Sequence, residues 1–266
     1  MRLIFIILLI TCNLLAQTPP VTNTQLPVSV QSGLVGYWSL NEAVWNGTHS
    51  EVKNHIASGG DGYRINYASA TTSGKFGNGG DFTGNASMAV IVPTTTAYNF
   101  GTSEFSISCW YKPTKSMVGQ ACGIVNLYHQ PFTWAWYIDT DDTFVFRGYN
   151  STGATARFAV KYSGIVALLT LNSWHHLVAT RDTGLAGKYA RLYVDGVELS
   201  TTAYEVPTDG ALFWNSCPIY IGNISNLWSI YHALGIIDEV AIWNRELSLN
   251  EIKAIYRAGV GGMIIQ

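Results

Sequence analysis

Residues 174–199, WHHLVATRDTGLAGKYARLYVDGVEL, decide the fold of this chain. Two runs of strand length, His175–Arg181 and Ala190–Val194, are rich in β-branched, aromatic and other apolar residues. Asp195-Gly196 then separates the second run from the apolar residues 197–199, and Asp-Gly between apolar runs is the strongest short signal for a β-hairpin. The stretch therefore predicts neighbouring antiparallel strands, which are typical of all-β domains.

Similar short runs recur along the chain between turn signals made of Gly, Asn, Ser and Pro. Residues 105–111, Phe-Ser-Ile-Ser-Cys-Trp-Tyr, alternate with a period of two, as expected for a half-buried strand. The other predicted strands cover residues 34–40, 87–92, 124–128, 134–138, 143–147, 219–221 and 236–243. Many short strands at near-regular spacing predict an all-β fold, a two-sheet antiparallel β-sandwich of the jelly-roll type.

One short C-terminal helix is predicted beside the sandwich. Ser248 is its N-cap and Glu251 follows three residues later, which is the capping-box pattern. Ile252 and Ile255 then lie on one face of the helix. Gly259 is the predicted C-terminal stop.

The N-terminus has the features of a targeting segment. A basic residue is followed by an almost continuously apolar run and a small residue, so residues 1–16 are predicted to be a secretory signal peptide. Residues 17–32 contain three prolines and no charge and are predicted to form a linker. Residues 33–260 then form one domain, and residues 261–266 form a tail. We expect a secreted, extracellular protein without a membrane span after cleavage, while an uncleaved anchor stays open as the alternative.

Composition excludes some functions and leaves others open. The 266 residues are 48% hydrophobic and only 12% charged, with a net charge of −2, so nothing favours a nucleic-acid partner. After the signal segment, three cysteines remain, which are Cys109, Cys122 and Cys217. A secreted chain permits a disulfide between Cys109 and Cys122, but buried free thiols are equally consistent with the sequence. No Cys-x-x-Cys pattern indicates a zinc site.

Four ordered segments carry a resemblance to a known family. They are residues 33–42 (GLVGYWSLNE), residues 74–84 (GKFGNGGDFTG), residues 174–196, and residues 237–248 (IDEVAIWNRELS). Together they resemble the laminin-G-like jelly-roll domain of the concanavalin A-like lectin and glucanase group. The resemblance implies two antiparallel sheets packed face to face. Five large side chains then look like core anchors: Trp38, Phe82, Trp110, Trp174 and Tyr193.

The resemblance also implies a structural calcium ion at the edge of the sandwich. Such domains use an acid on the last strand and groups from the first long loop. Asp238 is the matching acid, and Glu42 and Asn54 lie in the matching loop region. Carboxylate and amide oxygens suit Ca²⁺, which takes six to eight oxygen ligands. The family usually has an Asp where this chain has Asn41 or Asn54.

Two loop regions have the aromatic and polar mixture expected of a glycan site. The first contains Tyr128, His129, Trp134 and Trp136, with both tryptophans on one side of a strand. The second contains Trp214, Trp228 and Tyr231. The alternative is that these rings fold back over an end of the sandwich.

Catalysis has the least support in the sequence. Retaining glucanases need two carboxylates about 5 Å apart on the same face of a strand. Residues 139–142 are turn-like and contain no Glu, while Asp238 and Glu239 are neighbours that a regular strand points to opposite faces. The sequence therefore favours a secreted, non-catalytic domain that binds a glycan. An extracellular adhesion or assembly domain that binds a protein is the alternative, and a glycoside hydrolase comes third.

Overall fold

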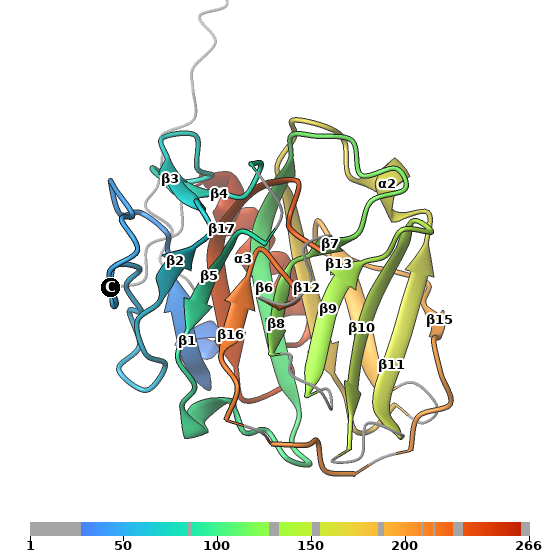
Figure 1. Ribbon diagram of the computed structural model, residues 1–266. Helices are drawn as coiled ribbons and strands as arrows, with labels where there is room; N and C mark the ends of the chain where they lie inside the picture. Colours follow the sequence, from blue (N-terminus) through green and yellow to red (C-terminus); the bar gives the residue numbers. More distant parts are fainter. Residues whose placement is uncertain are drawn as a thin grey trace, which may run out of the picture.

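The computed structural model describes residues 28–84, 87–127, 133–150, 155–185, 189–208, 210–214, 216–225 and 231–261, and shows a β-sandwich (Figure 1). All strand pairs in these ranges are antiparallel and form two sheets, so the predicted fold class is confirmed. No helix in the described ranges is long and apolar enough to cross a membrane.

The first sheet has eight strands in the order β14-β13-β12-β6-β17-β4-β3, with β1 also paired to β17. Their bounds are β1 (Leu34–Trp38), β3 (Ser69–Thr71), β4 (Gly79–Asp81), β6 (Phe105–Pro113), β12 (His175–Arg181), β13 (Ala190–Val194), β14 (Val197–Glu198) and β17 (Gly235–Trp243). The predicted hairpin joins β13 to β14. Asp195 and Gly196 both have positive φ, 52° and 77°, as a two-residue hairpin turn of this hand requires.

The second sheet has nine strands in the order β15-β11-β10-β9-β8-β16-β5-β2, with β7 also paired to β9. Their bounds are β2 (Tyr63–Ile65), β5 (Ala89–Val92), β7 (Cys122–Gly123), β8 (Val125–Leu127), β9 (Trp134–Ile138), β10 (Thr143–Tyr149), β11 (Ala156–Ser163), β15 (Thr202–Ala203) and β16 (Ile219–Ile221). Strand β11 was absent from the sequence prediction, although Phe158, Val160 and Tyr162 alternate with the period of a strand. Short helical segments η1 (Thr96–Tyr98) and α2 (Ile165–Leu168) lie in connections.

The space between the sheets is filled mainly by aromatic rings. Phe105 of β6 stacks on Phe100 with ring centroids 4.3 Å apart and contacts Trp134 and Phe146 of the other sheet at 5.7 Å. Burying a ring of this size stabilises the fold by roughly 1.5–3 kcal/mol. The predicted anchors Trp38 and Phe82 are fully buried in this core. Trp174 is only half-buried, and the Lys112 ammonium lies 5.2 Å from its ring centre, so it is not a core anchor.

Helix α3 (Leu249–Gly261) covers the outer face of the first sheet, behind it in Figure 1. The capping box is confirmed, because Ser248 N donates to Glu251 Oε2 at 2.9 Å and Glu251 N donates to Ser248 Oγ at 3.3 Å. The predicted stop at Gly259 is wrong, since the helix continues to Gly261. Gly259 instead permits close packing: a Cβ there would lie 2.0 Å from the Trp110 ring.

The predicted linker ends too late. Residues 28–31 form helix α1 (Val28–Gln31), which packs on the domain. Trp243 Nε1 donates to the Val30 carbonyl at 2.7 Å, and the Arg245 guanidinium donates to the carbonyls of Ser29 and Ser32 at 2.6 and 2.8 Å. These long-range bonds cannot be read from a local pattern of prolines. The predicted signal peptide and the rest of the linker lie outside the described residues.

Cys109, Cys122 and Cys217 are buried free thiols. Of the two alternatives, the structure has the free thiols and no disulfide between Cys109 and Cys122. Burial raises the pKa of the Cys122 thiol to about 12, so it remains protonated at neutral pH. These cysteines pack as small apolar side chains.

Candidate binding site

The predicted calcium acid, Asp238, is fully buried on β17. Its Oδ2 accepts hydrogen bonds from the backbone N–H groups of Lys75 and Phe76 at 2.7 and 3.0 Å, and its Oδ1 accepts from Glu239 N at 2.9 Å. Burial raises the pKa of Asp238 to about 7, against the opposing effect of these donors. The side chain therefore organises the loop at residues 75–76.

Glu42 and Asn54 also accept backbone hydrogen bonds. Glu42 Oε1 accepts from Lys53 N at 2.8 Å, and Asn54 Oδ1 accepts from the N–H groups of Tyr37 and Ile56 at 3.0 and 2.8 Å. A calcium ion would have to share oxygens that already order the first long loop. Calcium binding by Glu42, Asn54 and Asp238 stays a prediction.

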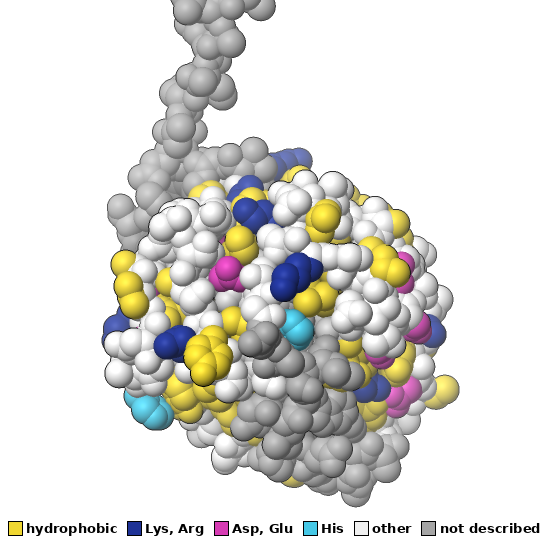
Figure 2. Space-filling model, turned by 45° about the horizontal axis from the view of Figure 1, so that its top comes forward, with side chains coloured by type: hydrophobic (Ala, Val, Ile, Leu, Met, Phe, Trp, Pro, Cys, Tyr) yellow, Lys and Arg dark blue, Asp and Glu magenta, His cyan; other side chains and the backbone are white. Residues whose placement is uncertain are grey.

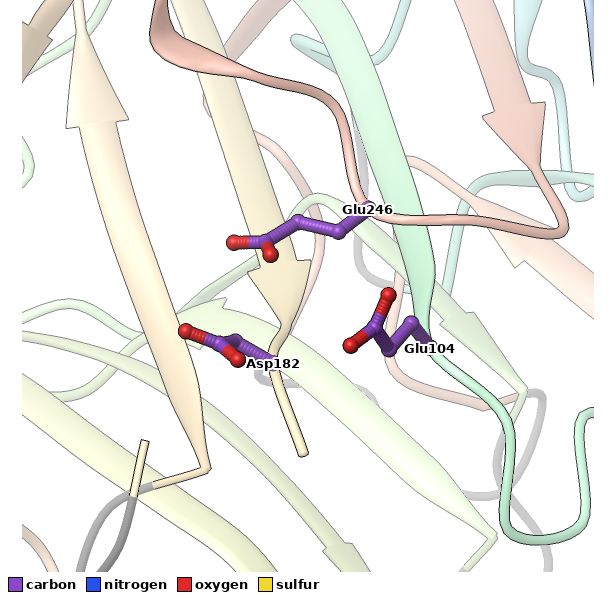
Figure 3. A group of neighbouring side chains, drawn as sticks. All are labelled: Glu104, Asp182 and Glu246. Atoms are coloured by element: carbon purple, nitrogen blue, oxygen red, sulfur yellow. The ribbon is translucent and has the colours of Figure 1, made fainter. Parts of the chain in front are cut away.

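A different group of carboxylates meets at one end of the first sheet (Figure 3). Glu104 precedes β6, Asp182 follows β12 and Glu246 follows β17, and their ligand oxygens lie within 4.8 Å of one another. Arg191 pairs with Asp182 at 2.6 Å and with Glu246 at 2.7 Å, so the group already holds a cation of the chain itself. Burial, reinforced by Asp182, raises the pKa of Glu246 to about 7.

The first predicted aromatic loop does not form a ligand platform in the part that the structure describes. Trp134 and Trp136 do lie on one side of β9, as the period of two predicted, but that side faces the core and both rings are fully buried. Their assignment as ligand-binding residues is therefore wrong for this conformation, because a sheet has two faces and alternation does not say which one is covered. Tyr128 and His129 lie outside the described residues.

The second predicted loop is also described only in part. Trp214 is half-buried against the core, and Trp228 lies outside the described residues. Tyr231 is half-buried on the outer face of the second sheet, where its ring meets the Tyr137 ring edge-on at 5.9 Å. Tyr231 thus belongs to a cluster of side chains that was not predicted from the sequence.

Arg147 of β10 is the centre of that cluster. In the strand register it lies opposite Ala135 of β9 and Ala159 of β11, so small neighbours leave room for its side chain to lie across the sheet. Its guanidinium carbon is 5.4 Å from the Tyr137 ring centre and 5.2 Å from that of Tyr204. These distances are those of cation–π contacts.

Polar bonds complete the cluster at its rim. The Arg147 guanidinium lies 3.3 Å from Glu205 Oε1 and donates to the Tyr149 hydroxyl at 3.1 Å, and that hydroxyl donates to Glu205. Tyr137 and Tyr149 are buried, whereas the Arg147 and Glu205 side chains are 19% and 35% exposed. The tyrosine–arginine cluster consists of Tyr137, Arg147, Tyr149, Lys161, Tyr204, Glu205 and Tyr231.

The sequence contained a signal for this cluster. Tyr137 alternates with Trp134 and Trp136 on β9, and Arg147 alternates with the core residue Phe146 on β10. Assigning the tryptophans to the core would have placed Tyr137 on the outer face. Partners from distant segments, such as Tyr204 and Glu205, come to Arg147 only through tertiary pairing.

Comparisons with known proteins agree with the architecture. A family model described as "Concanavalin A-like lectin/glucanases superfamily" matches residues 83–253, which is more than half of the chain. No curated protein matches the sequence.

Solved structures with the same fold include toxin binding domains. The binding domain of Paraclostridial Mosquitocidal Protein 1 superposes with a TM-score of 0.62 at 17% identity, covering 86% of this chain and 53% of that one. The botulinum neurotoxin serotype D binding domain superposes with a TM-score of 0.63 at 15% identity, covering 86% and 53%. This chain spans about half the length of either structure. At such identity the likeness shows the fold.

Proposed function

Because this chain belongs to the concanavalin A-like lectin/glucanase superfamily, we propose that it is an exported, non-catalytic domain that binds a glycan. The observation that carries the proposal is the tyrosine–arginine cluster on the outer face of the second sheet. The second sheet faces the viewer in Figure 1, with no helix of the described ranges in front of it. The similar toxin domains are named as binding domains, which supports a binding role.

The chemistry of the cluster suits a sugar. The half-exposed rings of Tyr204 and Tyr231 offer apolar faces for the C–H side of a sugar ring, while Arg147 and Glu205 offer a donor and an acceptor for its hydroxyls. Binding sites of this kind combine aromatic walls with a few fixed polar groups. Arg147 is held by the Glu205 carboxylate and three rings, so little side-chain freedom is lost on binding.

The buried acids of β17 support the non-catalytic part of the proposal. Asp238 and Glu239 are adjacent, and a β-bulge interrupts the register after Asp238, with Glu239 at φ 53°. Both carboxyl groups are no more than 1% exposed, and the Tyr37 hydroxyl donates to Glu239. A glycosidic bond cannot reach this pair in the folded domain.

Calcium is part of the proposal as a structural ion held by Glu42, Asn54 and Asp238. All three side chains order the first long loop or the loop that meets it, so an ion there would tighten the same region. Titration calorimetry with Ca²⁺ into EDTA-treated protein checks this. We expect heat and a higher melting temperature, and the absence of both would remove calcium from the proposal.

The glycan assignment is tested on an array of glycans with the wild-type chain and Tyr231→Ala. We expect specific binding that falls at least tenfold in the variant, because a sugar loses its stacking face. Tyr162→Ala is the matched control, since this half-buried tyrosine packs toward the core side of the same sheet. Binding that is lost equally in both variants, or that is absent from every glycan with and without Ca²⁺, contradicts the proposal.

An adhesion or assembly domain with a protein partner is the second candidate. Tyrosine and arginine, which make up most of the cluster, are also the residues enriched at the centres of protein interfaces. A negative array combined with capture of one defined extracellular protein, abolished by Tyr231→Ala, would favour this candidate over a glycan.

A further inference from the structure

Tyr67 occupies an unusual backbone conformation. It lies in the connection between β2 and β3, where the chain passes from the second sheet to the first. Asn66 and Tyr67 are consecutive residues with positive φ, 50° and 69°. Asparagine tolerates this region, but a bulky residue there costs about 1–2 kcal/mol. A tyrosine at this position therefore needs a reason.

Packing does not supply that reason. The Tyr67 side chain is 78% exposed, and it is the one aromatic residue among the large, strongly exposed hydrophobic side chains of the described ranges. In those ranges its hydroxyl has no hydrogen-bond partner. A ring that is strained and exposed contributes little to stability, so a functional role is the better explanation.

The residues on both sides of Tyr67 are held in place. Ala68 is fully buried, and its N–H donates to the Ile65 carbonyl at 3.2 Å. Asn66 Nδ2 donates to the Ser87 carbonyl at 2.9 Å, and the Arg64 guanidinium donates to the Ala68 carbonyl at 3.4 Å. The Tyr67 ring is thus presented to solvent from an ordered base.

Two small pockets share Tyr67 as a lining residue. One has a volume of about 250 Å³ and adds the polar side chains of Ser69, Asp81 and Thr83 to the Tyr67 wall. The other has a volume of about 240 Å³ and adds Arg64 and Asn66. Each is smaller than a pocket for a drug-sized molecule, and suits a single sugar unit.

The polar groups in these pockets fit hydroxyls. Asp81 Oδ1 accepts from Thr83 N at 2.8 Å, which holds the carboxylate of this pocket-lining residue in a fixed orientation. Arg64 and Asn66 provide donors in the second pocket. One pocket thus contains an acid and the other a base. Figure 2 shows charged side chains of both signs scattered over one face of the molecule, without a broad patch of one sign.

We propose that Tyr67 and the two pockets that share it form a second binding site, which takes a neutral oligosaccharide with one sugar unit in each pocket. The choice of a glycan rests on the proposed function, whereas the place does not, because no residue of the tyrosine–arginine cluster lines either pocket. The tyrosine supplies a stacking face, and Asp81 in one pocket and Arg64 in the other select hydroxylated units.

The test uses ¹⁵N-labelled full-length chain titrated with maltohexaose, cellohexaose and chitohexaose. We expect amide shifts at residues 64–69 and 81–84 with at least one of them. Tyr67→Gly should weaken that binding at least tenfold while its melting temperature stays equal or rises, because glycine adopts positive φ without strain. Ser50→Gly, also at positive φ (63°) and exposed, is the control that relieves strain without altering binding.

The outcomes separate this site from the tyrosine–arginine cluster. Shifts confined to the amides around Tyr137 and Tyr204 would overturn the Tyr67 site and leave the proposed function standing. Shifts confined to residues 64–84 would support the Tyr67 site and would show that the tyrosine–arginine cluster does not bind these glycans. The proposal is overturned if Tyr67→Gly binds like the wild type. It is also overturned if this variant loses more than about 1 kcal/mol of stability, because the tyrosine ring would then have a structural role.

Discussion

The two outer faces of the sandwich differ in what covers them. On the first sheet, Val178, Tyr193 and Trp243 are buried beneath Ile252 and Ile255 of α3. On the second sheet, Arg147 takes the corresponding outward position and is surrounded by tyrosines and Glu205, with part of its charge in contact with water. Both faces follow the same strand alternation. The face covered by α3 contributes to stability by burying apolar side chains, whereas the face of the second sheet leaves Arg147 and Glu205 partly exposed to a ligand.

The covered face also contains a buried base. His176 is fully buried, with its ring 5.2 Å from the Trp110 ring and its Nε2 2.9 Å from Ser108 Oγ. Burial lowers the pKa of His176 to about 3, although the nearby charge of Asp195 opposes the shift. His176 is thus enclosed, in contrast to Arg147, whose side chain is 19% exposed.

The largest expected effect comes from removing Trp110. This ring packs against Tyr256 at 5.9 Å and against the Gly259 backbone, so Trp110→Ala leaves a cavity beneath α3. We expect a loss of about 3–5 kcal/mol in the free energy of unfolding, measured in urea, with unchanged glycan affinity under folding conditions. A loss below about 1 kcal/mol would show that α3 does not depend on this face.

The pH dependence of stability gives a smaller effect on the same face. The folded state keeps His176 neutral, whereas the unfolded chain binds a proton near pH 6.5, so the stability from this group is complete above pH 6.5 and is lost as the pH falls. Relative to His176→Gln, the wild type should lose about 2 kcal/mol between pH 7 and pH 5.

Urea unfolding of both proteins at pH 5, 6 and 7 measures this difference. The variant is a necessary reference, because the raised pKa values of Asp238 and Glu246 change stability in the opposite direction over part of this range. Parallel pH curves for the two proteins would show that His176 has the same pKa in the folded and unfolded states, and would contradict the prediction.

The smallest expected change in stability lies on the second face. Arg147→Lys keeps the charge but loses the planar guanidinium, whose Nη1 donates to both Glu205 and the Tyr149 hydroxyl. We expect less than about 1 kcal/mol of destabilisation, together with a several-fold loss of affinity for the best glycan of the array. Full glycan affinity in this variant would show that Arg147 takes no part in binding, and the contrast between the two faces would then be one of burial alone.

Local patterns predicted well wherever a few neighbouring residues settle the structure. The Asp195-Gly196 turn and the Ser248 capping box depend on hydrogen bonds and φ values within a few residues, and both are present as expected. The end of α3 was predicted wrongly because Gly259 is required for close packing against the Trp110 ring, which is distant in the sequence. Helix α1 was missed for the same reason, since its contacts are made by Trp243 and Arg245.

By itself, the sequence determined the all-β class, most strands and which residues share a face of each strand. Alternation is a property of the extended backbone, so it can be read from the order of residues alone. Only the tertiary structure decided which face is buried. It turned Trp134 and Trp136 toward the core, placed Tyr137 and Arg147 outside, and brought Tyr204, Glu205 and Tyr231 to them from remote segments. Burial depends on the layer that packs over a strand, and that layer comes from elsewhere in the chain.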